Sequence, residues 1–184
     1  MYILFMSNYT ILSIDKNSIQ QLDKYIPEIV KLRRNIWINT YVNNDIGITK
    51  DKVIGNFREF NEEVQKYKEY IYKIKNFSYF FVVLDNDRLI GFSIAKKIFY
   101  KKSIDTLFIN DDYQGNGLGS KLMHKMIDML DSSKIYVDVI SYNEKAINFY
   151  KKYNFSYLNK HRPIVLDRIT PRIFVPQIRM RRII

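Results

Sequence analysis

The chain has 184 residues, of which 47% are hydrophobic and 27% charged, a composition that suits a single domain spanning residues 1–184. It contains no cysteine, which excludes disulfides and thiolate nucleophiles, and its 2 histidines have no metal-ligand spacing, so no metal is expected. The net charge of +11 favours anionic partners, but a lysine-rich surface accounts for it, and nucleic acid is not expected as a partner.

The N-terminus carries no recognisable targeting signal. Residues 1–6 are briefly apolar, but they lack a basic leader, a long apolar run and a small-residue cleavage site. The stretch is also too short to cross a bilayer. We therefore expect a cytoplasmic monomer or homodimer without membrane attachment, and disorder in the first five or so residues.

The first part of the chain predicts one strand followed by a helical segment. Alternating apolar and polar residues indicate a strand at residues 9–14. Ser18, with a Gln three residues later, has the form of a capping box that starts a helix. Pro27 suits the first turn of a helical segment that continues to Tyr41, because proline lacks the N–H that would be unpaired there.

A long helix and a series of strands follow. Thr49 is the expected N-cap of one helix at residues 50–75, whose apolar residues recur at helical spacing. The remaining elements are expected in this order: strands at 79–84 and 89–100, a turn at 101–103, a strand at 104–109, a glycine loop, a helix from 118 to 130, a strand at 135–140, a helix at 143–153, a strand at 155–159 and a last strand within 173–181. This order predicts a mixed α/β fold with a right-handed crossover around the glycine loop.

The glycine loop is the first candidate for a ligand site. Three glycines alternate in Gln114-Gly115-Asn116-Gly117-Leu118-Gly119, between a predicted strand and a predicted helix. With few side chains in the way, several backbone N–H groups can converge on one anion, and the helix N-terminus adds a partial positive charge. Both effects suit a pyrophosphate, although glycine-rich turns of this kind also occur for packing alone.

A dinucleotide-binding motif is the alternative explanation of the loop. Asp138 follows Gly119 by 19 residues (138 − 119), close to the position of a ribose-binding acid. The third glycine, however, comes one residue too early for that motif, and helices and hairpins rather than a βαβ unit precede the loop. The dinucleotide interpretation therefore fails on its context.

A second pattern lies in the helix expected at 143–153. Asn143, Ala146, Phe149, Tyr150 and Tyr153 fall at i, i+3, i+6, i+7 and i+10, along one helical face. Taken alone, core packing would explain them. Together, Gln-x-x-Gly-x-Gly and Asn-x-x-Ala-x-x-Phe-Tyr-x-x-Tyr-x-Phe resemble the GNAT (GCN5-related) N-acetyltransferase family, and the resemblance covers residues 9 to 180 in the same element order.

The resemblance implies a fold and an activity. The fold class is α/β (mixed α+β): a GNAT-like central mixed, mostly antiparallel sheet flanked by helices, with a V-shaped splay between Ile104–Ile109 and Ile135–Ile140. The activity is acetyl-CoA-dependent N-acetyl transfer to a primary amine, by direct attack in a ternary complex.

The resemblance also assigns cofactor contacts by position. Backbone groups near Phe108 and Ile109 would bind the pantetheine arm and the acetyl carbonyl, and the glycine loop would hold the pyrophosphate. Lys152 is a candidate partner of the 3′-phosphate, with a solvated lysine as the alternative. The full set is Leu107, Phe108, Ile109, Gln114, Gly115, Asn116, Gly117, Leu118, Gly119, Ser120, Asn143, Ala146, Phe149, Tyr150 and Lys152.

Three residues are candidates for proton transfer. In the family pattern Tyr150 supplies a proton to the departing CoA thiolate. The base that receives the proton of the amine is Asp105 or Asp138, and we slightly prefer Asp105. Because aspartate is one methylene shorter than the glutamate common at such positions in related enzymes, a relay through water is expected. A satisfied structural carboxylate is the alternative for each.

The acceptor is less defined. The region around Trp37, Tyr41 and residues 47–49 resembles a subset that includes spermidine/spermine acetyltransferases, and these aromatics would line an acceptor pocket or only pack in the core. A polyamine would need acidic pocket residues, for which the candidates are Asp45, Asp51, Glu59, Glu62 and Glu63. The charge of +11 argues against a cationic acceptor, so a peptide N-terminus, a lysine or an amino-sugar drug stays open, as does a non-catalytic acyl-CoA-binding or nucleic-acid-binding regulator.

Overall fold

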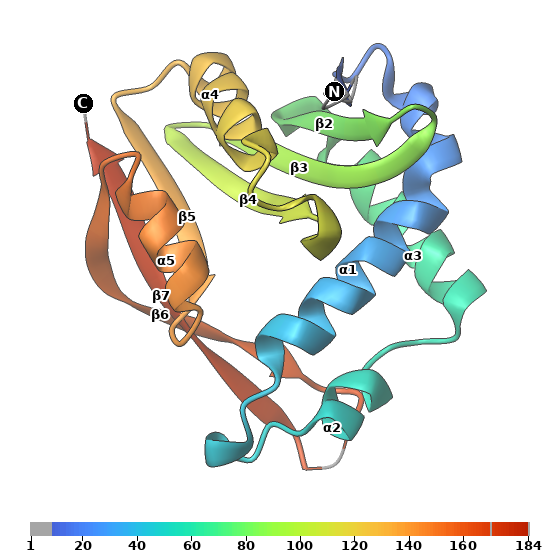
Figure 1. The fold of residues 1–184 in the computed structure, drawn as a ribbon, viewed down its shortest axis with the longest axis vertical. Helices are drawn as coiled ribbons and strands as arrows, with labels where there is room; N and C mark the ends of the chain where they lie inside the picture. The colour runs from blue at the N-terminus through green and yellow to red at the C-terminus, as the bar shows by residue number, and fades with distance from the viewer. Residues whose placement is uncertain (1–8, 170, 184) are drawn as a thin grey trace, which may run out of the picture.

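The computed structural model describes residues 9–169 and 171–183, which form a seven-stranded sheet with helices on both faces (Figure 1). The disorder expected for the first residues concerns a segment outside this range. The strand order is β1-β2-β3-β4-β5-β7-β6. The strands are β1 (Tyr9–Ile14), β2 (Ser78–Asp85), β3 (Arg88–Ile98), β4 (Lys101–Ile109), β5 (Lys134–Ile140), β6 (Phe155–Leu166) and β7 (Ile173–Ile183).

The helices divide the core into two main clusters. The α-helices are α1 (Ile26–Tyr41), α2 (Lys50–Gly55), α3 (Phe60–Ile74), α4 (Leu118–Leu130) and α5 (Glu144–Lys151), and the short 3₁₀ helices are η1 (Ile19–Tyr25), η2 (Asn44–Ile46), η3 (Lys75–Phe77) and η4 (Asp111–Tyr113). The apolar face of α4 packs on one side of the sheet, while α1 and α3 cover β2 and β3 on the other (Figure 1). A smaller third cluster joins the end of α1 and α2 to β6 and β7.

The sheet is mixed and mostly antiparallel, as predicted, and β4–β5 is the parallel pair among the described strands. This pair is short: it ends at Ile104 opposite Val137, after three residue pairs. A bulge lies at the next residue, because Ile104 and Thr106 pair with consecutive residues of β3 and Asp105 has no partner there. Beyond this point the two strands diverge, which is the splay expected between Ile104–Ile109 and Ile135–Ile140.

Several local signals act as predicted. Pro27 lies in the first turn of α1. The Thr49 side chain accepts a hydrogen bond from the Lys52 N–H at 3.4 Å and caps α2. Asn143 caps α5, its Oδ1 accepting from the Ala146 N–H at 3.0 Å. These signals are local, so they act within one turn of the residue that carries them.

The single helix expected at 50–75 is wrong. The chain forms α2 and α3, separated by residues 56–59. Asn56 caps the end of α2, and its side-chain Oδ1 accepts the Arg168 N–H at 3.2 Å. Phe57 turns inward against Trp37, with ring centroids 6.0 Å apart. Tertiary contacts of this linker thus override a helical pattern that continues through it.

Three further expectations need correction. Ser18 does not start an α-helix with a capping box: it precedes η1 and bonds back to Asp15, whose N–H donates to Ser18 Oγ at 3.0 Å. The turn placed at 101–103 lies earlier, at Phe99 and Tyr100, because pairing with β3 extends β4 back to Lys101. The strand placed at 155–159 continues to Leu166, since β7 pairs along its whole length through two irregularities.

Two properties bear on partners. None of the helices in the described residues has both the length and the apolar character needed to cross a membrane. Within the same residues, His, Asp and Glu side chains form no group of three or more with metal-binding geometry.

Candidate active site

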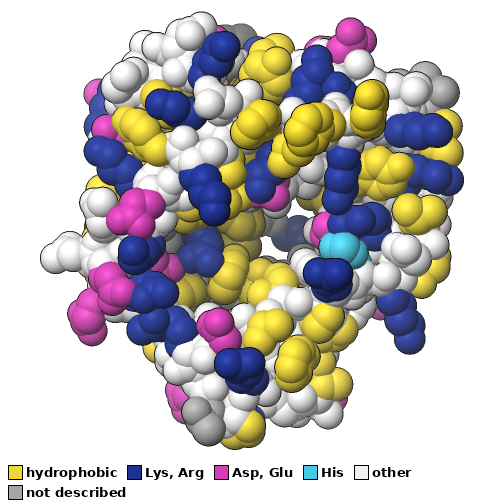
Figure 2. All heavy atoms as spheres, turned by 180° about the vertical axis from the view of Figure 1, so that it is seen from behind, with side chains coloured by type: hydrophobic (Ala, Val, Ile, Leu, Met, Phe, Trp, Pro, Cys, Tyr) yellow, Lys and Arg dark blue, Asp and Glu magenta, His cyan; other side chains and the backbone are white. Residues whose placement is uncertain are grey.

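A cavity of about 570 Å³ opens where β4 and β5 diverge. Its walls come from β4, β5, α1, α3 and α5, with the β6–β7 hairpin and the α2–α3 linker at its far end. Figure 2 shows a hollow near the centre of one face of the molecule, bordered by both hydrophobic and basic side chains. The splay of the sheet therefore creates a large open space on this face.

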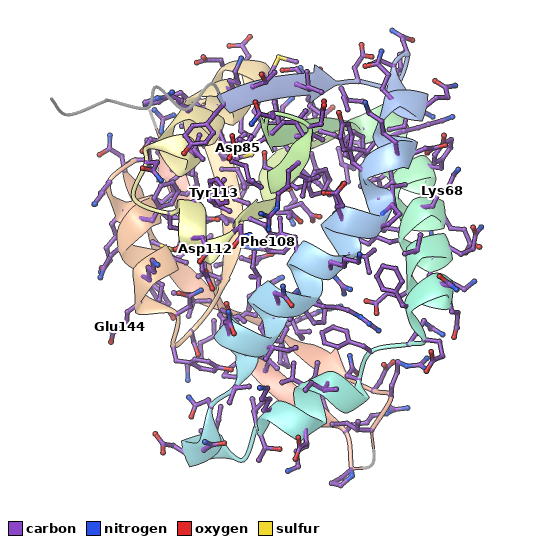
Figure 3. The ribbon with its side chains drawn as sticks, turned by 45° about the vertical axis from the view of Figure 1, so that its right-hand side comes forward. Lys68, Asp85, Phe108, Asp112, Tyr113 and Glu144 are labelled. Carbon is purple, nitrogen blue, oxygen red and sulfur yellow. The ribbon has the colours of Figure 1, made fainter. Side chains whose placement is uncertain are left out.

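The cavity gathers many of the predicted site residues and leaves others outside. Those that line it are Trp37, Tyr41, Asp105, Leu107, Phe108, Asp138, Asn143, Ala146 and Tyr150. Those outside its lining are Ile109, residues 114–120, Phe149 and Lys152. Phe108 lies where β4 faces α1 (Figure 3). The predicted face of α5 is thus divided, because Phe149 and Tyr153 pack instead against the core beneath α4.

The glycine loop is braced from below and open above. The Tyr113 hydroxyl donates to Asp85 Oδ2 at 3.0 Å, which ties η4 to the end of β2 (Figure 3). The Gln114 side chain donates to the Ile109 carbonyl at 3.0 Å and accepts from Lys145, so it holds the loop in place. Gly117 has φ 75°, in the left-handed region, at the start of α4.

The loop and its surroundings fit a CoA pyrophosphate. Gly115 and Gly117 are exposed, and a Cβ added at either would meet no atom within 4 Å, so the space beside the loop is open. The first turn of α4 contains no acidic residue and leaves its N–H groups for an anion. Gly119 allows close packing on α5, since its Cβ would meet the Phe149 ring at 3.4 Å. These residues, with the unpaired edge of β4 at Leu107 and Phe108, would hold the cofactor.

Tyr150 is a buried phenol on the cavity wall. Its side chain is buried, between the Phe149 ring at 5.5 Å and the Phe155 ring at 5.6 Å, both edge-on. Burial raises the pKa of Tyr150 well above its usual value. The residue therefore remains protonated at neutral pH and is able to donate a hydrogen bond or a proton.

Asp105 is held by two side chains, one from β3 and one from α3. The Lys96 ammonium lies 2.7 Å from Oδ1, and the Tyr70 hydroxyl donates to Oδ2 at 2.8 Å. Lys96 also lies 2.7 Å from the Tyr70 hydroxyl, which closes a triangle. Burial, and after it the charge of Asp105, raises the pKa of Tyr70. The bulge in β4 aims Asp105 at these partners.

Asp138 is bound more completely. Arg179 on the adjacent strand β7 donates to both of its carboxylate oxygens, at 2.7 Å and 2.8 Å. His161 Nε2 lies 2.7 Å from Arg179 Nη2 and 3.3 Å from Asp138 Oδ2. Burial lowers the pKa of His161 in spite of the nearby carboxylate, so the imidazole is neutral at pH 7.

The opposite wall is aromatic and basic. Trp37 and Tyr41 stack with ring centroids 4.5 Å apart, and the Arg33 guanidinium lies 3.8 Å from the Trp37 ring centroid. Of the five acidic residues considered for binding a polyamine, Glu63 alone lines the cavity. It is buried and paired with Arg33 at 2.6 Å and Arg34 at 2.9 Å.

Five residues of the site were not identified from the sequence: Arg33, Tyr70, Lys96, His161 and Arg179. Each acts through a partner distant in the chain or in an adjacent strand, so residue type alone gives no signal. Pairing the residues of β5 with those of β7 would have identified one ion pair, because Asp138 and Arg179 are directly opposite each other in the strand register.

The fold and the position of this cavity define an acyltransferase. The profile of the Acetyltransferase (GNAT) family matches residues 49–155, and the chain belongs to this family. It is therefore an acetyl-CoA-dependent acetyltransferase, as the resemblance in the sequence predicted.

Relatives differ in their acceptors. The chain is 30% identical over 108 residues to N-alpha-acetyltransferase 30 of Schizosaccharomyces pombe, covering 53% of this chain and 71% of the relative. It is 31% identical over 58 residues to the spermine/spermidine N(1)-acetyltransferase of Bacillus subtilis, covering 29% of this chain and 38% of that enzyme. The fold resembles the crystal structure of PaiA N-acetyltransferase from Thermoplasma acidophilum in complex with coenzyme A, with TM-score 0.61, 14% identity and coverage of 96% and 99%.

The role of the loop can be tested at Gly117. An alanine there disfavours the left-handed backbone by about 1–2 kcal/mol. If the loop relaxes to avoid this strain, its N–H groups turn away and binding must restore them, so we expect the Kd of CoA to rise about tenfold in titration calorimetry. Gly47→Ala is the matched control, because Gly47 has nearly the same φ, 74°, but lies at the end of η2 and not in the glycine loop. Equal CoA affinity in wild type and Gly117→Ala would remove the loop from cofactor binding.

Proposed function

We propose that the protein transfers an acetyl group to the α-amino group of a peptide or protein, by direct attack within a ternary complex. One observation carries this choice of acceptor: each carboxylate that lines the cavity is already bound by a cation. Arg33 and Arg34 bind Glu63. Lys96 binds Asp105, and Arg179 binds Asp138.

The charge balance disfavours a polycation. The lining contains four basic side chains, Arg33, Arg58, Lys66 and Arg168, against three acidic ones. Outside the lining, Arg34, Lys96 and Arg179 add three positive charges, while Glu62 and Glu69, the partners of Arg58 and Lys66, add two negative ones, so basic side chains are in excess. A polyamine would bring further positive charges next to these groups, and like charges in a partly enclosed site repel strongly. A peptide presents one amino group on an otherwise neutral or acidic chain.

Deprotonation favours an α-amine as well. An alkyl amine with a pKa near 10.4 requires about 4.6 kcal/mol to be neutral at pH 7, whereas an α-amine with a pKa near 7.8 requires only about 1 kcal/mol. Because both candidate bases are held in ion pairs, an acceptor that needs little help suits this site. The S. pombe relative is named for N-alpha-acetylation, which supports the same choice.

The residues of the chain divide the work as follows. Bound acetyl-CoA supplies the acetyl group as a thioester, so that transfer forms an amide and releases CoA as a thiol. Tyr150 holds the proton that the departing sulfur takes up, and burial keeps this phenol protonated. Asp105 takes the proton of the amine through a water molecule. Leu107 and Phe108 orient the donor through the backbone of β4.

Polyamine acetylation is the second candidate, favoured by the match to the B. subtilis enzyme. A panel of acceptors separates the two: a hexapeptide with a free N-terminus, the same peptide with a blocked N-terminus and an internal lysine, and spermidine. We expect CoA release with the free N-terminus, at a kcat/KM at least about tenfold above the other two. Faster turnover of spermidine would overturn the α-amine proposal.

Tyr150 is the residue on which the mechanism depends most. We expect Tyr150→Phe to lower kcat by about 10²-fold, in the range of general-acid catalysis, while the Kd of acetyl-CoA changes less than about twofold. Tyr153→Phe is the matched control, because Tyr153 lies one turn further along the chain and packs against His124 outside the cavity. An unchanged kcat in Tyr150→Phe would exclude the phenol as the acid.

The base is tested by pH profiles of the two aspartate variants. We expect Asp105→Asn to lower kcat/KM for the peptide about tenfold on the acid limb, and Asp138→Asn to have a smaller effect because Arg179 occupies both of its oxygens. In both variants the midpoint of the acid limb should lie near pH 8, where the acceptor α-amine loses its proton. If neither substitution changes the acid limb, bulk solvent takes the proton.

A further inference from the structure

A second pocket adjoins the main cavity on the same face of the sheet. It measures about 360 Å³, and the two spaces share Asp105, Asp138 and Gln177 in their linings. The second pocket continues towards the β3–β4 hairpin, where Ile98 and Lys101 line it. Together the two spaces form a trough that follows β4 from the splay to the hairpin.

The second pocket is basic. Its two aspartates are held by Lys96 and Arg179, as in the main cavity. Lys101 adds a positive charge to the lining. One further cation, Arg162, lies close by, since it acts on His161 together with Arg179 and Lys101 and helps burial to lower the pKa of His161. A ligand in this pocket therefore meets an excess of positive charge.

The hairpin beyond the pocket is unusually exposed. Phe99 is 85% and Tyr100 100% exposed, although both are large aromatic residues. Two-residue hairpin turns usually contain Asn or Gly, yet Phe99 adopts φ 47° here. Lys101, which follows Tyr100 directly, lines the second pocket, whereas Lys97 and Lys102 alternate with the lining residues and lie on the other face of the sheet. The trough thus ends at Lys101, next to two exposed aromatic residues.

We infer that this trough binds an extended acidic peptide, and that the second pocket receives an acidic side chain a few residues after the acetylated N-terminus. The inference rests on the proposed α-amine acceptor and names its sequence preference. Strands rise about 3.3 Å per residue, so Lys101 lies roughly 13 Å along β4 from Asp105, the length of about four extended residues. The acidic residue is therefore at position 3 to 5 of the acceptor.

Three hexapeptides that differ only at residues 3 to 5, with Glu, Gln or Lys there, test the preference. At low salt we expect wild-type kcat/KM to be about tenfold higher for the Glu peptide than for the Gln peptide, and lowest for the Lys peptide. Lys101→Glu should abolish or reverse this order, because one attraction becomes a repulsion. The kcat/KM of the Gln peptide should differ less between the two proteins than that of the Glu peptide.

Lys16→Glu is the matched control, since it makes the same charge change on the exposed turn after the edge strand β1, three strands away from β4. It should keep the wild-type order of peptides. Equal kcat/KM for the Glu and Gln peptides in wild type would overturn the inference and leave the proposed function intact. Salt-sensitive binding of single-stranded RNA, lost in Lys101→Glu, without any peptide preference, would also overturn it, in favour of a nucleic-acid partner.

Binding measured without turnover separates the two proposals. Titration calorimetry of the Glu and Gln peptides into the CoA-saturated protein reads the second pocket even if no peptide is acetylated. Tighter binding of the Glu peptide without acetylation would refute the proposed function and support the acidic site. Equal binding with no acetylation would overturn both.

Discussion

The short parallel pairing of β4 with β5 is the constraint on which the site depends. Pairing stops at Ile104, and the bulge at Asp105 turns the rest of β4 away from β5. The divergence leaves the β4 backbone at Leu107 and Phe108 without a partner on that side, and opens the main cavity between the strands. A fully paired β4 would close the cavity and satisfy the backbone groups that a pantetheine arm needs.

The charges around the cavity are the second constraint on the site. Around the cavity the protein neutralises its own carboxylates, with Glu63, Asp105 and Asp138 each bound by a lysine or arginine. These pairs fix side chains from different elements relative to one another and leave an excess of positive charge over the whole trough. In the function we propose, the field that attracts the phosphates of CoA also disfavours a polyamine, so the cofactor and acceptor preferences would have one physical origin.

Features that depend on local signals could be predicted from the sequence. Proline at position 27 lacks the N–H that would be unpaired in the first helical turn, and the side chains of Thr49 and Asn143 accept hydrogen bonds from the N–H groups of the turn that follows. All three act as expected. The patterns that failed depend on distant contacts. Residues 56–59 break a helical pattern because Phe57 packs on Trp37, and the hairpin turn moved to Phe99 because β3 continues to pair with β4 back to Lys101.

By itself, the sequence determined the class of the protein and its cofactor. The glycine loop and the Asn143–Phe155 pattern are each one continuous stretch of the chain. Each can therefore be recognised from its own residues, without knowledge of distant contacts. Only the tertiary structure decided how the candidate bases are held, because Asp138 meets Arg179 through strand pairing across 41 residues and Asp105 meets Tyr70 across 35. It also decided that Lys101 lies in a strand beside a second pocket rather than in a turn. Such pairings arise from strand register and packing, which no local pattern encodes.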